Sequence, residues 1–115
     1  MRNLAFALVI LGATTSVVLA AERPIRFWNL TRHTISEFTL APAGSTNWGA
    51  DQCKNDKDGT VDSDERLRIT DTPPGTYDAK LTDVSGRTCV VRNIKLEAGE
   101  IFSIEERDLT DCTTR

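Results

Sequence analysis

Short runs of alternating apolar and polar residues are the feature that most constrains the fold of this chain. Such runs recur between residues 25 and 106, and turn-forming residues separate them. A period of two places successive side chains on opposite faces of a strand, whereas the helical period near 3.6 is almost absent here. The sequence therefore predicts an all-β protein, a small antiparallel β-sandwich or open barrel of about six strands.

The strands are expected in two groups with a loop between them. A polar turn at 31–34 joins the first two strands, and 41–53 is expected to be a loop because Pro42, Gly44 and Gly49 interrupt any period. From Glu65 onward the chain is expected to form a meander of hairpins with glycine in its turns. The expected strands are Ile25–Leu30, Ile35–Leu40, Arg66–Ile69, Tyr77–Leu81, Cys89–Leu96 and Ile101–Glu106.

The first 20 residues follow a different pattern. Arg2 precedes the apolar segment 4–13, and Val18-Leu19-Ala20 supplies the small residues that signal peptidase requires. This predicts a signal peptide over 1–20, a single domain over 21–115 and a periplasmic or secreted location, as in a Gram-negative bacterium. The alternative is a single-pass anchor, but the apolar run is shorter than the roughly 20 residues that span a bilayer. We therefore expect no membrane anchor.

The charge of the exported part argues against one class of partner. Removal of residues 1–20 takes away Arg2 and leaves 13 basic against 17 acidic side chains, a net charge of −4. The basic residues are scattered singly along the sequence, whereas phosphate backbones require clustered Lys and Arg. We expect no nucleic-acid partner.

Three cysteines, Cys53, Cys89 and Cys112, lie after the predicted signal peptide. An oxidising compartment favours one disulfide and one remaining thiol, and three pairings are open. The odd cysteine could instead bridge two chains. No two of the three are spaced as metal-thiolate ligands are.

The segment 51–65, DQCKNDKDGTVDSDE, is the most distinctive part of the sequence, and we call it the acidic loop. It carries six carboxylates and two lysines, a net charge of −4, and a bound cation would relieve their repulsion. The alternative is a solvated loop whose Asp and Gly residues only make turns. The candidate metal ligands are Asp56, Asp58, Asp62, Asp64 and Glu65, with Asp51 less certain.

Part of this loop matches a calcium-binding register. Gly59 would take the sharp-turn position and Glu65 the closing bidentate position. Lys54 would occupy the first ligand position, where it cannot bind a cation, and neither flank is predicted as a helix. We therefore expect no standard EF-hand but a loop of another geometry. Oxygen ligands favour hard cations, Ca²⁺ first, Mn²⁺ next, and a trivalent lanthanide if four or more carboxylates converge.

Several motifs are similar to those of a group of small secreted alphaproteobacterial proteins. The motifs are Asn29-Leu30-Thr31, the turn 41–45, Trp48-Gly49-Ala50-Asp51, Tyr77-Asp78 and the turn from Asp83 to Gly86. The chain departs from this group at Gln52-Cys53, where the group has two leucines, and in its longer and more acidic segment 54–65. The resemblance implies an exported β-protein and assigns no catalytic residue.

Other residues indicate binding rather than catalysis. His33 is the only histidine and is expected in an exposed turn, and no activated nucleophile is recognisable, so we expect no enzyme. Trp48, in a loop, is expected either to plug the end of the sandwich or to bind a partner. The acidic residues at 105–111 are expected in a polar tail or, with the acidic loop of a second chain, in a site shared by a homodimer.

These observations predict an exported, non-enzymatic binding module. The first hypothesis is a protein that binds or carries Ca²⁺ or a lanthanide through the acidic loop. The alternative is a protein-interaction or envelope structural module that binds no metal and uses Trp48 and an exposed strand edge.

Overall fold

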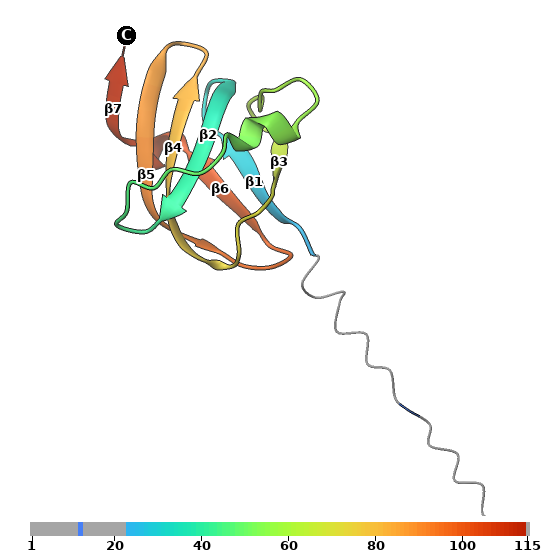
Figure 1. The fold of residues 1–115 in the computed structure, drawn as a ribbon. Coiled ribbons are helices and arrows are strands. Elements are labelled where there is room, and N and C mark those ends of the chain that lie inside the picture. Colours follow the sequence, from blue (N-terminus) through green and yellow to red (C-terminus); the bar gives the residue numbers. More distant parts are fainter. Residues whose placement is uncertain (1–11, 13–22, 115) are drawn as a thin grey trace, which may run out of the picture.

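The chain folds into two packed β-sheets. We describe a computed structural model that covers residue 12 and residues 23–114. Its seven strands confirm the predicted small β-sandwich, with three strands in one sheet and four in the other (Figure 1). The strands are β1 Ile25–Leu30, β2 Ile35–Pro42, β3 Arg66–Ile69, β4 Gly75–Asp83, β5 Arg87–Leu96, β6 Ile101–Glu105 and β7 Thr110–Thr114, with 3₁₀ turns η1 Gln52–Asn55 and η2 Glu106–Asp108.

The pairing of the strands differs from the predicted meander. The three-stranded sheet has the order β3-β1-β6, and the four-stranded sheet has the order β2-β4-β5-β7. Only β4 and β5 form a hairpin within the predicted meander, since β3 and β6 pair with β1 on the other side of the core. The turn at 97–100 therefore crosses between sheets and does not close a hairpin. Alternation fixes which residues face the core but not which strands become neighbours.

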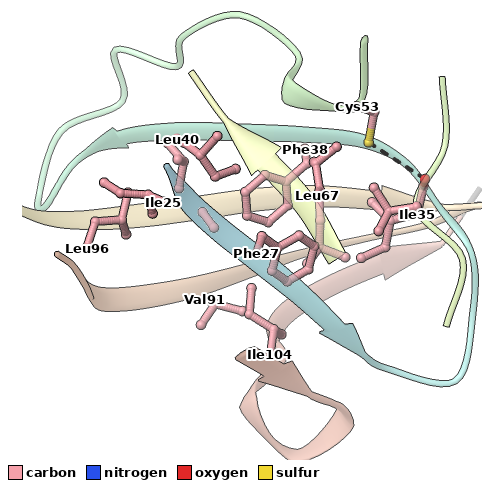
Figure 2. Packing of buried hydrophobic residues seen from close by; sticks show 14 of the residues in the cluster. Ile25, Phe27, Ile35, Phe38, Leu40, Cys53, Leu67, Val91, Leu96 and Ile104 are labelled. Atoms are coloured by element: carbon pink, nitrogen blue, oxygen red, sulfur yellow. Dashed lines mark hydrogen bonds between the residues drawn. The ribbon is translucent and has the colours of Figure 1, made fainter. Parts of the chain in front are cut away.

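The core lies between the two sheets and is built on aromatic rings. Phe27 of β1 stacks on Phe38 of β2 with ring centroids 4.3 Å apart, so the two sheets meet at this pair. Phe102 of β6 packs against both rings. Figure 2 shows aliphatic side chains from both sheets around Phe27 and Phe38. Burial of such aliphatic and aromatic surface is the main stabilising term of a domain this small.

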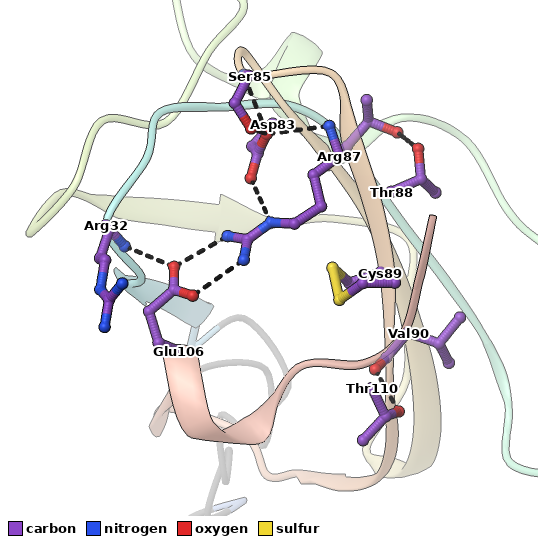
Figure 3. The surroundings of a disulfide bond; sticks show 11 residues. Arg32, Asp83, Ser85, Arg87, Thr88, Cys89, Val90, Glu106 and Thr110 are labelled. Atoms are coloured by element: carbon purple, nitrogen blue, oxygen red, sulfur yellow. Dashed lines mark hydrogen bonds and ion pairs between the residues drawn. A yellow bond between two sulfur atoms is a disulfide. The ribbon is translucent and has the colours of Figure 1, made fainter. Parts of the chain in front are cut away.

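The cysteines divide into one disulfide and one buried thiol. Cys89 of β5 is bonded to Cys112 of β7, which selects one of the three predicted pairings (Figure 3). Cys53, on η1, is fully buried, and its thiol donates to the carbonyl of Ile35 at 3.7 Å (Figure 2). Burial, followed by the nearby carboxylate of Asp51, raises the pKa of this thiol to about 12. A bridge between chains through Cys53 would require the core to open, so the structure removes the basis for that dimer.

Two further sequence predictions concern the ends of the chain. The predicted signal peptide, residues 1–20, lies outside the described residues apart from Gly12. In the described part of the chain, no helix has the length and apolar character needed to cross a membrane. The predicted polar tail was wrong, because residues 110–114 form β7 at the edge of the four-stranded sheet.

Candidate functional site

The acidic loop is an ordered connection between the two sheets. Asp51 begins η1, and its carboxylate accepts hydrogen bonds from the N–H groups of Cys53 and Phe38, both at 3.0 Å. Val61 then forms an isolated bridge with Ile35 at the start of β2. Asp51 is thus a helix-capping residue that also holds the edge of β2, so its carboxylate is already engaged within the chain.

Three other carboxylates of the loop accept hydrogen bonds from groups within the chain. Asp56 accepts from the N–H of Asp58 at 3.0 Å, around a turn in which Gly59 takes a left-handed φ of 74°. Asp62 accepts from the hydroxyl of Thr34 at 3.1 Å. Asp64, itself left-handed at φ 71°, accepts from the indole N–H of Trp28 at 3.0 Å. Of these three contacts, that of Asp56 is typical of a turn-forming Asp residue, whereas those of Asp62 and Asp64 tie the loop to distant parts of the chain.

Two carboxylates of the loop lie close together. Glu65 accepts the N–H of Asp62 at 2.9 Å, which lowers its pKa, but burial and the neighbouring carboxylate of Asp56 raise the pKa by more. Within the part of the chain that the structure describes, no three acidic, histidine or cysteine side chains form a group that could hold a metal ion. The structure therefore brings Asp56 and Glu65 together but does not gather the full predicted ligand set.

Trp48 lies beside the four-stranded sheet. Its ring is half-buried, and the ammonium group of Lys80, on β4, lies 5.9 Å from the ring centroid. The loop that carries it is tied to β2 by the hydrogen bond from Gly49 N–H to the carbonyl of Leu40 at 2.9 Å. Contact of Trp48 with a partner stays a prediction.

The acidic residues near the C-terminus are engaged within the chain. Glu106 accepts two hydrogen bonds from the guanidinium of Arg87, at 2.9 and 3.0 Å, and Asp108 accepts the N–H of Glu105 at 2.8 Å. Asp111 forms an ion pair with Arg92 at 3.2 Å. These intramolecular partners leave the predicted site shared between two chains without structural support.

The cluster around Arg87 joins the hairpin turn at 83–86 to η2. Figure 3 shows the guanidinium of Arg87 between the carboxylates of Asp83 and Glu106. Hydrogen bonds from Arg87 lower the pKa of Glu106 to about 2. Burial alone would raise the pKa of Asp83, but hydrogen bonds from Ser85 and Arg87 outweigh it and the net shift is downward. A guanidinium that is fully paired with two carboxylates in this way typically holds two segments of a fold together.

Arginines that are scattered singly along the sequence come together on the outer face of the three-stranded sheet. Arg26 of β1 lies directly opposite Arg68 of β3, and Arg66 lies opposite Trp28. The guanidinium carbon of Arg66 is 4.4 Å from the centre of the Trp28 ring. Alternation already places these residues outward, but only the pairing of β1 with β3 brings them together.

A pocket of about 870 Å³ opens at the end of the sandwich where β1 begins and β3 ends. We call it the end pocket. Arg23 and Arg68 line it together with Asp71, Thr70 and Thr72. The rest of its lining is apolar and consists of Pro24, Ile25, Ile69, Pro73, Pro74 and Ala98.

No protein-family model, curated protein sequence or solved structure matches the chain. Three features of the described residues could bind a partner or ligand: the sheet edge at β7, the Asp56–Glu65 pair and the arginines at the end pocket.

Proposed function

We propose that the protein is an exported, non-enzymatic binding module that takes up an extended segment of a partner protein along β7. The observation that carries this proposal is the position of β7 at the edge of the four-stranded sheet with all five of its residues exposed. Figure 1 shows β7 on the outside of the sheet, beyond β5. An exposed edge presents backbone N–H and C=O groups to which another strand can bond.

Contacts within the chain cover parts of the other three sheet edges, which supports β7 as the binding edge. Along β2, the loop donates from Gly49 to Leu40, and Asp51 accepts from Phe38. On β3, Asn55 donates to the carbonyl of Arg68 at 2.9 Å. At the end of β6, the carboxylate of Asp108 occupies the N–H of Glu105. Natural β-proteins cover their edges in this way to prevent unwanted pairing.

The composition of β7 also favours strand addition. Three of its five residues are threonine, a β-branched residue that favours extended backbone, and it contains neither proline nor lysine. Its one charged residue, Asp111, takes a left-handed φ of 49° where the register with β5 shifts, so we expect pairing along Cys112–Thr114. The disulfide between Cys89 and Cys112 holds β7 to β5, so the strand is fixed before a partner arrives. Such preorganisation lowers the entropic cost of binding. The disulfide, the predicted signal peptide and the resemblance to secreted proteins together favour an oxidising compartment.

The test is selection of partners from a library of displayed heptapeptides, followed by titration of the selected peptides into isotope-labelled protein. We expect the peptides to shift the amide resonances of Thr110–Thr114. The double variant Thr113→Lys, Thr114→Lys should weaken binding at least tenfold because lysines guard an edge. Thr76→Lys, at an exposed position of the interior strand β4, is the matched control and should bind normally. Failure to select any peptide, or shifts confined to residues outside β7, would reject the proposal.

The proximity of Asp56 and Glu65 supports a second function, binding of a hard cation at the acidic loop. Burial and repulsion from Asp56 raise the pKa of Glu65, and a bound cation would replace this repulsion by attraction. Two carboxylates supply up to four oxygen ligands, and Ca²⁺ completes its coordination with carbonyl groups and water. The pair would hold Ca²⁺ or, more tightly, a trivalent lanthanide.

The cation proposal is tested by melting the protein in millimolar Ca²⁺ and in micromolar La³⁺. Binding to the folded state should raise the melting temperature, by mass action. Glu65→Gln should abolish the rise, whereas Asp58→Asn, at an exposed neighbouring position, should leave it intact. If neither ion changes the melting temperature, or if Glu65→Gln responds as the parent protein does, this second function is rejected.

A further inference from the structure

Like charges face each other where β1 pairs with β3. Arg26 and Arg68 are direct cross-strand partners, an arrangement that destabilises a sheet unless something neutralises it. The ion pairs formed among residues 23–114 involve Arg87, Arg92, Lys95 and Arg107, and neither Arg26 nor Arg68 takes part in them. The protein as a whole is acidic, so this positive charge is local. An anionic group bound here would relieve the repulsion.

Arg23 extends this positive charge over the end pocket. Its guanidinium donates to the carbonyl of Ala98 at 2.9 Å and lies directly over Gly99. A Cβ atom at position 99 would approach Nε of Arg23 to 2.7 Å, and Gly99 has a left-handed φ of 76°. A side chain at position 99 would therefore displace the guanidinium, and glycine lets Arg23 lie over the turn. A guanidinium has five N–H donors, and the bond to Ala98 uses one.

The walls of the end pocket are suited to hydrocarbon. Six apolar residues form most of its lining, and its volume of about 870 Å³ lies in the range of small-molecule sites. Arg23 and Arg68 are the two cationic residues of the lining, and Asp71 is its one carboxylate. Asp71 opposes a high negative charge on any ligand. The combination suits a ligand with an apolar body and a singly charged anionic end.

We propose that the end pocket binds a single-chain amphiphile with a carboxylate head group. The guanidinium groups of Arg23 and Arg68 hold the carboxylate through charge-assisted hydrogen bonds, for which their planar geometry is matched. The chain of the ligand lies against the apolar walls formed by Ile25, Pro73 and Pro74. No residue that lines this site belongs to β7 or to the Asp56–Glu65 pair, so its test is independent of theirs.

The first test is titration of isotope-labelled protein with decanoate below its micelle concentration. We expect saturable shifts of the amide resonances of Ile25, Arg68, Thr70 and Ala98. Decanol, which has the same chain without the charge, should bind at least tenfold more weakly. Absence of saturable shifts, or equal affinity for decanol, would overturn the proposal. Binding to vesicles of anionic phosphatidylglycerol without binding of decanoate would overturn it too and assign the arginines to a membrane surface.

Variants separate the pocket from general electrostatic attraction. Arg23→Gln and Arg68→Gln should each weaken decanoate binding about tenfold or more, the loss of one charge-assisted contact. Gly99→Ala should also weaken it, because the added Cβ displaces Arg23. Arg66→Gln is the matched control, since Arg66 lies on the same strand and face but outside the pocket lining. Equal weakening by all three arginine variants, in proteins with unchanged melting temperature, would reject the pocket as the site.

Discussion

The acidic loop and the cluster around Arg87 both concentrate carboxylates, but they treat them in opposite ways. In the loop, burial and the neighbouring carboxylate of Asp56 raise the pKa of Glu65. In the cluster, Asp83 and Glu106 face one guanidinium, and both pKa values fall. The number of acidic residues in a segment therefore says little about their pKa values until the partners of each carboxylate are known. One region stores repulsion that a ligand can relieve, and the other is already neutralised.

The largest loss of stability is expected when Arg87, which is paired with both carboxylates of the cluster, is removed. Arg87→Ala leaves the buried carboxylate of Asp83 without its guanidinium and should lower the free energy of unfolding by about 3 kcal/mol. Urea denaturation measures the loss. Arg107→Ala breaks an exposed ion pair with Glu105 and serves as the control, with little or no change expected. If the free energy of unfolding falls no more than in the control, the cluster does not hold the hairpin turn to η2 as we expect.

A smaller effect, with a defined pH dependence, is expected at Glu106. Glu106→Gln should lower the free energy of unfolding at pH 7 by about 2 kcal/mol, the value of a hydrogen bond to a charged group. The folded protein holds the pKa of Glu106 at about 2, below its ordinary value of 4.5. The stabilisation is therefore complete above about pH 4.5 and is lost as the pH falls towards 2. Denaturation at several pH values should show the variant and parent converging at acid pH, and a constant difference would be inconsistent with this linkage.

The smallest expected effect is a gain in stability, and it comes from a substitution in the acidic loop. Glu65→Gln removes the repulsion with Asp56 and keeps an oxygen that can accept the N–H of Asp62. Because the loop is partly exposed, the gain in the free energy of unfolding at pH 7 should be only about 0.5 kcal/mol. A raised folded pKa means that the gain disappears below the ordinary value, where Glu65 is protonated in both states. Thermal melting at pH 7 and pH 3 measures it, and a loss of stability at pH 7 would show that the pair is not repulsive.

The sequence predicts the strands of this protein better than their partners. The first strand, Ile25–Leu30, has the predicted bounds, and β2 and β5 are each two residues longer than expected. Alternation in one strand carries no information on which distant strand lies beside it, so the parallel pairing of β1 with β6 could not be deduced. For the same reason, the meeting of Arg26 with Arg68 was not foreseen.

The last strand and the acidic loop show two other limits. The strand β7 buries none of its residues, so it lacks the apolar alternation by which the others are recognised. The feature of its sequence that could have indicated a strand is its three threonines, which favour extended backbone. In the acidic loop, successive turns separate the carboxylates. Asp64 is directed to the indole of Trp28, whereas Asp56 lies beside Glu65. The carboxylates of the acidic loop are all close in sequence, but only some of them are close in space.

The central position of β1 in the three-stranded sheet has a consequence for how the protein forms. Phe27 pairs with Leu67 on one side and with Phe102 on the other, so the earliest strand has partners that are synthesised much later. This sheet cannot close until the ribosome has made β6, which ends at Glu105. Contacts so distant in sequence slow folding, because the intervening chain must first be brought together. The three-stranded sheet therefore stays open until β6 has been synthesised, whereas β4 and β5, which are adjacent in sequence, can pair earlier.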